Sequence, residues 1–245
     1  MNRRHYLTSL TAGLCCGAWA TPKRQKQIFL VIDDAGLVLR ETQQFLDIPV
    51  PMTIAVLPHQ KQTKEVCKAV WRDPNKEIIL HQPMEAYNQD KNPGKGAIYN
   101  ETNPAEVRNI LDRNLKSVRG AVGMNNHMGS RVTENSELMS EVLRYCKGRE
   151  LFYLDSKTAY NSLVPRIAAK EGMHMEERHV FLDIQHDQAY IRRMWSSAIS
   201  HAKQHGYVVV IGHIWSKHSA GAIRDSYETL QNQGYSFHLL SELYT

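Results

Sequence analysis

The chain has 245 residues, of which 42% are hydrophobic and 22% charged, so it can bury a core and is not disordered by composition. Its length suits one domain of roughly 200–250 residues after a targeting segment is removed. The formal net charge of +5 is a mild excess, and no basic run of the kind that follows a nucleic-acid backbone is present. Nucleic-acid binding is therefore not expected.

The first twenty residues have the pattern of an export signal. A basic start, MNRRHY, precedes the apolar stretch LTSLTAGLCCGAWA, which ends in a small-x-small cleavage pattern. This stretch is too short to span a bilayer comfortably, so no transmembrane span is expected. We expect residues 1–20 to be a signal peptide, residues 25–245 to form one domain, and the mature protein to be periplasmic or secreted. Arg3 and Arg4 also resemble a twin-arginine signal, and the choice between that route and the Sec route stays open.

Two cysteines remain after this segment, Cys67 and Cys146. Each lies in an amphipathic helical pattern, which is typical of a small buried hydrophobic residue. A disulfide between them stays open at this point. The absence of a Cys-x-x-Cys pair excludes a zinc ribbon.

Short β-rich runs alternate with helical patterns along the rest of the chain. The predicted strands are 28–32, 52–57, 77–80, 151–154, 180–182, 207–211 and 235–240, with 121–124 as a weaker candidate. Most of these runs are apolar without alternation, as expected for parallel strands covered on both faces. Three apolar stripes with helical spacing are the clearest. The first begins after Asn103, the second ends at Gly148, and the third ends at Gly206. This alternation predicts an α/β fold with a parallel sheet or barrel, and residues 86–103 are expected to form a surface loop.

Residues that can catalyse or bind metal follow most of the predicted strands. They are Asp33 and Asp34, His81, the group Asn125-Asn126-His127, Asp155, Asp183 and His213. Because the carboxyl ends of parallel strands meet at one rim, we expect these side chains to lie together. Each residue taken alone has a simpler explanation, since an Asp after a strand is often a turn former or helix cap.

An Asp and two His residues are a familiar ligand set for a hydrolytic zinc ion. A second carboxylate beside the Asp ligand can accept a proton from the water that attacks the substrate. Asp34 would then bind the metal and Asp33 would act as the base. The alternative is that the two carboxylates only cap a turn between a strand and a helix.

Six segments, taken in order, make the resemblance to a known family specific. They are VIDDAG, IILHQPME, GMNNHMGSR, FYLDSKT, RHVFLD and IGH. In this order they resemble the divergent polysaccharide deacetylase family, an offshoot of the NodB-type carbohydrate esterases. The resemblance covers the chain from about Gln27 to its end. It implies a distorted (β/α) barrel of about seven parallel strands, a divalent metal site with Zn²⁺ as the default ion, and export.

The resemblance also implies roles for particular positions. Asp33 matches the general base, Asp34 the first metal ligand, and His81 the first histidine of the family's His-x-x-x-His motif. Glu85 stands where the second histidine of that motif would be. The third ligand is then Glu85 or His127, and we favour His127, with Glu85 as a ligand or as a partner that orients His81.

The remaining expected site residues lie in the second half of the chain. His213 matches the late histidine that serves as general acid, although Ile214 follows it where relatives usually have proline. Asp155 and Arg178 would tune or orient these groups, whereas a cap and a salt bridge would explain them equally well. Asn125 and Asn126 would bind a sugar or an oxyanion, or they would simply form the turn.

The resulting hypothesis is an exported, metal-dependent hydrolase that removes N-acetyl groups from a carbohydrate polymer such as peptidoglycan. Two alternatives stay open. The first is a catalytically silent domain that binds a glycan or an envelope partner, and the second is a hydrolase of another bond, such as an O-acetyl ester. Tyr87, Tyr99 and Trp215 are aromatic residues that could stack on sugar rings.

Overall fold

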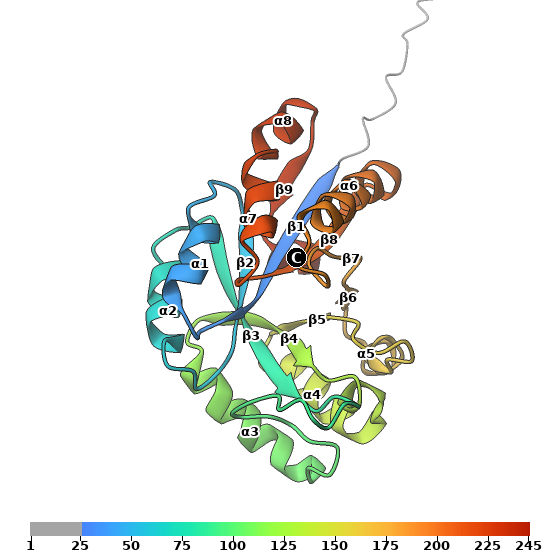
Figure 1. Cartoon of the computed structure of the whole chain (residues 1–245). Helices are drawn as coiled ribbons and strands as arrows, with labels where there is room; N and C mark the ends of the chain where they lie inside the picture. Colours follow the sequence, from blue (N-terminus) through green and yellow to red (C-terminus); the bar gives the residue numbers. More distant parts are fainter. Residues whose placement is uncertain (1–25) are drawn as a thin grey trace, which may run out of the picture.

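Parallel strands form one curved sheet, and helices surround its outer face (Figure 1). The structure is a computed structural model that describes residues 26–245, so the predicted signal peptide lies outside the described residues. Within them the strands are β1 (Gln27–Ala35), β2 (Met52–Val56), β3 (Lys76–Met84), β4 (Ala121–Met128), β5 (Phe152–Asp155), β6 (Glu176–Glu177), β7 (Val180–Phe181), β8 (Tyr207–His213) and β9 (Ser236–His238). Their order is β6-β5-β4-β3-β2-β1-β8-β7, and β9 pairs with β1.

The helices connect successive strands and pack on the outside of the sheet. They are α1 (Leu39–Leu46), α2 (Thr63–Val70), α3 (Pro104–Ser117), α4 (Ser136–Gly148), α5 (Val164–Glu171), α6 (Gln188–His205), α7 (Lys217–Arg224) and α8 (Tyr227–Asn232), with 3₁₀ turns η1 (Val132–Glu134) and η2 (Leu240–Tyr244). Helix α3 begins as predicted, because the Asn103 side chain accepts a hydrogen bond from the Ala105 N–H and Pro104 occupies the first turn. Helix α6 ends at Gly206, which takes the left-handed conformation with φ of 98°.

The sheet closes into a distorted barrel through the chain itself. Strand β6 pairs with β5 at one edge, and strand β7 pairs with β8 at the other. Only Arg178 and His179 separate β6 from β7, and their N–H groups donate to the carbonyls of Asp155 and Val209, one on each edge. Arg178 and His179 therefore bridge the two edges of the sheet, which are not joined by direct strand pairing within the described part of the chain.

Alternation along each strand divides the core into two layers. Phe29 and Val31 of β1 point into the barrel, while Ile28, Leu30 and Ile32 point outward under the helices. The inward set continues with Ala55, Ile79, Phe152, Leu154, Val209 and Ile211. Because side chains alternate with a period of two, the next inward positions toward the carboxyl ends are Asp33, His81, Asn125, His127 and His213.

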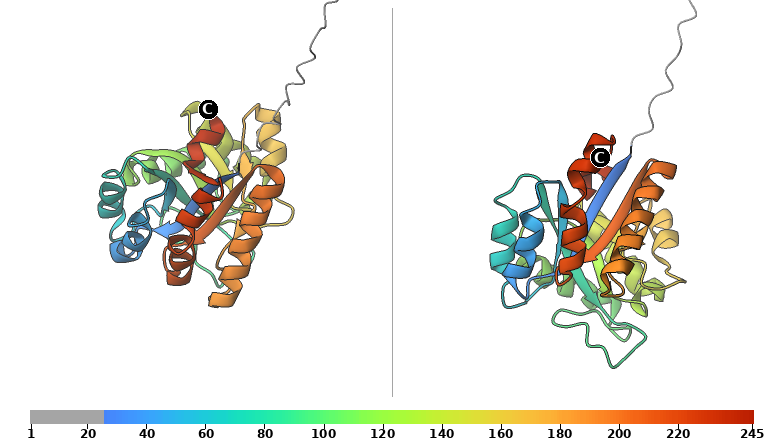
Figure 2. Two further views of the ribbon diagram at one scale, coloured as in Figure 1. Left: turned by 90° about the horizontal axis from the view of Figure 1, so that it is seen from above. Right: turned by 45° about the horizontal axis from the view of Figure 1, so that its top comes forward.

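The amino-terminal end of the barrel is filled by the end of the chain. Turn η2 lies within the ring of strands (Figure 1), and its Leu240 is buried in the interior cluster. The irregular segment 85–103 extends from the other end (Figure 2), where the strands finish. The interior is thus apolar at its amino-terminal end, whereas polar and titratable side chains lie at the carboxyl ends of the strands.

The parallel barrel predicted from the sequence is confirmed, with differences in detail. Strand β4 runs on to Met128, so Asn125, Asn126 and His127 lie within it and not after it. The described residues form nine strands against about seven predicted, because the weaker candidate 121–124 is strand β4 and the two-residue strand β6 was not among the predicted strands. Cys67 and Cys146 are both buried free thiols. Among the described residues, no helix is long and apolar enough to cross a membrane.

Candidate active site

A β-bulge in β1 places two consecutive carboxylates on the same side of the sheet. Ile32 pairs with Ile54 and Ala35 with Val56, so Asp33 and Asp34 together oppose one residue of β2. Asp34 adopts a left-handed conformation with φ of 69°, which is uncommon outside glycine. Regular alternation would turn Asp34 away from the barrel, and the bulge turns its carboxylate toward the histidines of β3 and β4.

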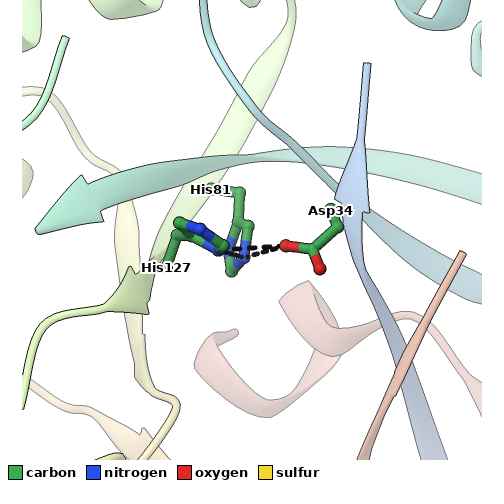
Figure 3. Close-up of side chains that lie close together, drawn as sticks. All are labelled: Asp34, His81 and His127. Carbon is green, nitrogen blue, oxygen red and sulfur yellow. Dashed lines mark hydrogen bonds and ion pairs between the residues drawn. The ribbon is translucent and has the colours of Figure 1, made fainter. Parts of the chain in front are cut away.

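Asp34, His81 and His127 form a cluster with the geometry of a metal site (Figure 3). Oδ1 of Asp34 lies 3.2 Å from Nε2 of His81 and 3.0 Å from Nδ1 of His127. The two ring nitrogens are 3.1 Å apart. Three donor atoms at these separations can reach one ion through bonds of about 2.1 Å.

The hydrogen bonding of Asp34 supports the same interpretation. Its Oδ1 is buried and accepts no hydrogen bond of acceptable geometry from any described residue, although both imidazoles are close. An uncompensated buried oxygen is costly, and a cation between the three side chains would compensate it. Burial alone would raise the pKa of Asp34, but His127 and His81 outweigh burial and hold it well below its ordinary value. The residues present therefore fit a divalent ion.

Asn125 fixes both the ligand His81 and the neighbouring carboxylate Asp33. Its Nδ2 donates to Oδ1 of Asp33 at 2.9 Å, and its Oδ1 lies 2.7 Å from Nδ1 of His81. An amide oxygen only accepts hydrogen bonds, so Nδ1 of His81 carries the proton and Nε2 presents its lone pair to the cluster. Asn125 is buried and its amide is used in this way, which indicates a positioning role, and the expected contact with substrate stays a prediction.

Asp33 is a buried carboxylate beside the cluster and outside it. Its Oδ2 is 3.8 Å from Nε2 of His81. Burial raises the pKa of Asp33, against the lowering effects of the His81 and His213 charges. In the β1–β8 ladder Asp33 is the direct neighbour of His213, so these two inward side chains lie side by side.

Asp183 fixes the position of the His213 ring and favours its protonated form. Nδ1 of His213 lies 2.6 Å from Oδ1 of Asp183, and the His213 N–H donates to Oδ2 at 3.0 Å. Ser219 donates a further hydrogen bond to the same Oδ2 at 2.8 Å. Burial disfavours the charged ring, but the bond to Asp183 and the nearby carboxylates outweigh it and raise the pKa of His213 to about 9. The imidazolium is therefore the dominant form at neutral pH.

The sequence places Asp183 at the end of a predicted strand and indicates no specific role for it. It lies two residues after Phe181, the last residue of β7, within the segment RHVFLD. The available signal for this pair was a carboxylate just after one predicted strand and a histidine at the end of another. The pairing could not be read from sequence alone, because it depends on β7 lying next to β8.

Trp215 covers the open side of the cluster. Its Nε1 donates to Oδ2 of Asp34 at 3.1 Å, and its ring stacks on His213 with centroids 4.9 Å apart. His186 packs against the other part of the ring. The expectation of a sugar-stacking aromatic is compatible with its partial exposure, whereas Tyr87 and Tyr99 are exposed on the 85–103 segment.

A cavity of about 240 Å³ opens beside these groups. Asp33, His81, His127 and His213 line it, together with Asn126, Met128, Ser156, Thr158, Phe181 and Ile184. The cavity thus gives a small ligand access to the candidate base, two of the candidate ligands and the candidate acid.

Glu85 lies apart from the three-residue cluster. Its Oε1 forms an ion pair with Arg131 at 2.9 Å, and its Oε2 accepts the Asn100 N–H at 2.6 Å. These contacts fasten the 85–103 segment to the turn that follows β4. The geometry therefore favours His127 over Glu85 as the third ligand, and no hydrogen bond found among the described residues links Glu85 to His81.

Asn126, Asp155 and Arg178 have contacts that favour the simpler explanations. Asn126 donates to the Met128 carbonyl and accepts from the Ser156 N–H, so its amide holds backbone together. Asp155 accepts from the Lys157 N–H and from Ser162, which makes it a turn former. Arg178 donates to the carbonyls of Ser156 and Lys157 and packs over Phe181, in place of the expected salt bridge. Their predicted catalytic and substrate roles stay untested.

Comparisons with known proteins agree with this architecture. The chain is 32% identical over 192 residues to an uncharacterized protein of Haemophilus influenzae Rd, covering 77% of this chain and 67% of the relative. It is 32% identical over 197 residues to the uncharacterized protein YibQ of Escherichia coli K12, covering 80% of this chain and 61% of that relative. The chain thus spans about two thirds of the length of these relatives.

Three solved structures show the fold. An uncharacterized protein of Agrobacterium tumefaciens C58 superposes with a TM-score of 0.84 at 21% identity, over 91% of both chains. A carbohydrate esterase family 4 pseudoenzyme from Bacillus anthracis gives 0.54 at 15%, over 91% of this chain and 66% of its own. The catalytic domain of a peptidoglycan N-acetylglucosamine deacetylase from Eubacterium rectale gives 0.52 at 14%, over 90% of both.

The family model for divergent polysaccharide deacetylases matches residues 30–244, which include every residue of the candidate site. The resemblance stated from the six sequence segments is therefore confirmed over nearly the whole described chain. The chain belongs to the divergent polysaccharide deacetylase family.

Proposed function

We propose that this protein is a metal-dependent deacetylase that hydrolyses N-acetyl, or O-acetyl, groups of a carbohydrate polymer. One observation carries the proposal. The Asp34–His81–His127 cluster has a buried carboxylate, Asp33, on one side and a charged histidine, His213, close by, and Asp33, His81, His127 and His213 line one cavity. This combination provides a metal site, a base and an acid within reach of one substrate group.

Asp34, His81 and His127 would hold the ion. Zn²⁺ is the default for one carboxylate and two imidazoles, and Co²⁺, Mn²⁺ or Ni²⁺ can occupy such donors as well. When bound, the ion supplies a Lewis acid that activates water and polarises the acetyl carbonyl.

Asp33 would accept the proton that water loses as it attacks the acetyl carbon. The hydrogen bond from Asn125 to Oδ1 keeps the carboxylate in position, and Oδ2 remains directed toward the cluster. Because burial raises its pKa, Asp33 holds the accepted proton better than an exposed aspartate would.

His213 would donate a proton to the leaving nitrogen. Its raised pKa keeps it protonated at neutral pH, and Asp183 holds the ring by its Nδ1, which leaves Nε2 to act as the acid. Breaking the C–N bond then yields acetate and a free amine. The same groups would release an alcohol from an O-acetyl ester.

A polymer of N-acetylated sugars, such as peptidoglycan, is the substrate class that we propose. The family to which the chain belongs supports a carbohydrate substrate, and the Eubacterium rectale deacetylase is a neighbour in fold. The basic start and the apolar stretch in residues 1–20 support export to the periplasm or beyond. Fusion of these residues to a reporter that is active only after export tests this step, and a reporter retained in the cytoplasm would contradict it.

Acetate release tests the enzymatic proposal directly. Residues 21–245 would be purified, loaded with zinc, and assayed on N-acetylglucosamine oligomers, peptidoglycan fragments and O-acetylated sugars. We expect release by the unaltered chain and a loss of about 10²- to 10⁴-fold in Asp33→Asn with its metal retained. Glu77→Gln is the matched control, because it alters a carboxylate at the opposite end of β3 from His81, where it accepts hydrogen bonds from Thr53 and from the Ser241 N–H.

A catalytically silent binding domain is the second candidate. Two observations favour it, namely the pseudoenzyme among the neighbours in fold and the small volume of the cavity beside the cluster. In that case a chain with one ion bound would release no acetate from any substrate in the panel. It would still bind one of the oligosaccharides, with an affinity that Asp33→Asn leaves unchanged.

A further inference from the structure

A second concave surface, here called the basic groove, lies on the outside of the barrel between α2 and α3. It has a volume of about 560 Å³. Five cationic side chains and one tryptophan line it, namely Lys61, Lys64, Lys68, Lys116, Arg119 and Trp71. Glu65 is the single carboxylate among its lining residues, so the groove has a strong excess of positive charge.

The cations of the basic groove are not explained by local structure. All five are exposed, and none of them forms an ion pair with any described residue. Lys64 stands in the first turn of α2, where the helix dipole disfavours a positive charge. Lys64 and Lys68 are also four residues apart on one helix face, a spacing at which like charges repel. An anion in the groove would relieve both unfavourable terms.

Trp71 provides a fixed aromatic surface within the same groove. Its side chain is 56% exposed, which is unusual for the largest apolar side chain. One part of the indole lies directly on Gly120, so closely that a Cβ there would come within 2.4 Å of the ring. The glycine has a φ of +81° and leaves room for the ring to lie against the backbone. The indole is thus supported from behind and open in front.

We propose that the basic groove binds a segment of anionic polysaccharide. Carboxylate or phosphate groups of the sugars would pair with the lysines and Arg119, and one sugar ring would stack on Trp71. The combination of charge and a supported indole favours a ligand that has both anionic groups and flat ring faces. The volume lies within the range of small-ligand pockets, about 300–1,000 Å³, and a concave surface fits a saccharide better than a flat membrane.

One edge of the basic groove lies in the loop after β2, which contacts the turn after β1. Gln60 lines one end of the groove, and the N–H of Gln62 donates to the carbonyl of Gly36 at 2.8 Å. Gly36 lies two residues after Asp34 in the sequence. The inference goes beyond the proposed function, because binding in the groove does not require turnover.

The test is calorimetric titration of the Asp33→Asn chain with tetragalacturonate, using neutral chitotetraose and inorganic triphosphate as comparison ligands. We expect tetragalacturonate to bind with an affinity that falls as salt rises. The double variant Lys64→Ala/Lys68→Ala should weaken binding at least tenfold at low salt. Trp71→Ala should weaken binding of tetragalacturonate about tenfold and leave binding of triphosphate unchanged, because only the sugar rings can stack on the indole.

A matched control uses two exposed lysines on other helices, Lys170 of α5 and Lys203 of α6. Lys170→Ala/Lys203→Ala should leave tetragalacturonate binding unchanged, and an equal loss in this variant would reduce the effect to overall charge and overturn the proposal. Three further results would overturn it: no binding of tetragalacturonate, equal loss of triphosphate binding in Trp71→Ala, or binding of neutral chitotetraose that Lys64→Ala/Lys68→Ala weakens to the same extent as binding of tetragalacturonate. Because the titrated chain lacks the proposed base, failure of the groove and failure of the deacetylase proposal remain distinguishable.

Discussion

The two ends of the barrel interior are built on the same strands and contain opposite kinds of side chain. At the amino-terminal end, inward positions hold Phe29 and Phe152 and are covered by Leu240 of η2. At the carboxyl end, the same inward alternation holds Asp33 and His81. One end is apolar, and the other concentrates buried charges.

This difference shows how the molecule tolerates those buried charges. Each charged group at the carboxyl end has a specific partner, as when Asn125 bridges Asp33 and His81 and Asp183 holds His213. The exception is Oδ1 of Asp34, which has no hydrogen bond to any residue that the structure describes. The apolar end stabilises the barrel, so the other end can keep an unfavourable arrangement that a bound ion would complete.

The largest expected effect comes from removing a ligand of the cluster. Asp34→Ala or His81→Ala should eliminate stoichiometric metal, because two donors hold a divalent ion far more weakly than three. Elemental analysis of residues 21–245 measures this loss. Glu85→Gln is the matched control and should retain its metal, since Glu85 pairs with Arg131 outside the cluster. Full metal content in both ligand variants would remove the site assignment.

The next effect concerns the pH dependence of His213. Its raised pKa of about 9 means that the charged form dominates at neutral pH, and activity should fall as pH rises through that value. Asp183→Asn should lower the pKa, so that the alkaline loss of activity begins at lower pH and the rate at pH 8 drops about tenfold or more.

The same shift has a consequence for stability with a definite sign. The folded pKa of His213 lies above its ordinary 6.5, so the stabilising contribution is complete below about 6.5 and is lost as pH rises through about 9. NMR titration of the ring proton checks the pKa in both proteins. An unchanged titration in Asp183→Asn would show that Asp183 does not set it.

A smaller effect is expected at Trp215. Trp215→Phe keeps a ring against His213 and removes the N–H that binds Oδ2 of Asp34. Partners that orient a ligand typically contribute 10- to 100-fold in metal affinity, so we expect a loss of about tenfold, measured by competition with a chelator. Trp71→Phe, on the outside of the barrel, should have no effect on metal. Equal losses in both variants would point to a general effect on folding.

The smallest effect on the site should come from the apolar end. Leu240→Ala removes a fully buried side chain and should lower the free energy of unfolding by about 3 kcal/mol. Metal content of the folded protein should stay the same. Urea denaturation with elemental analysis tests both statements, and Leu243→Ala, only partly buried in the same cluster, should cost less. Loss of metal in Leu240→Ala would mean that the two ends are coupled.

Much of the fold could be predicted because parallel strands covered on both faces leave long apolar runs. The segments before Asp33, His81 and His213 are such runs, and their carboxyl ends meet as expected. Strand β4 was the weaker prediction because its polar half, Asn125 to Met128, has the composition of a turn. It is nevertheless a strand, since buried partners satisfy its amides and imidazole.

The finer features of the site depend on tertiary contacts that the sequence does not display. Two adjacent aspartates give no sign of a bulge, which becomes visible only in the pairing of β1 with β2. The preference for His127 over Glu85 depends on Arg131 and Asn100 reaching the carboxylate. Asp183 gained a role only through the neighbouring positions of β7 and β8.

The bulge in β1 has a consequence at the level of the gene. Asp33 and Asp34 face the same side only because β1 contains one residue more than its partner requires. Deleting a single codon for either aspartate would restore regular pairing and leave one inward carboxylate at that position. A single deletion would thus leave the core of the barrel intact and alter the chemistry of the site. Grafting this site onto another barrel would require transferring the extra residue together with the side chains.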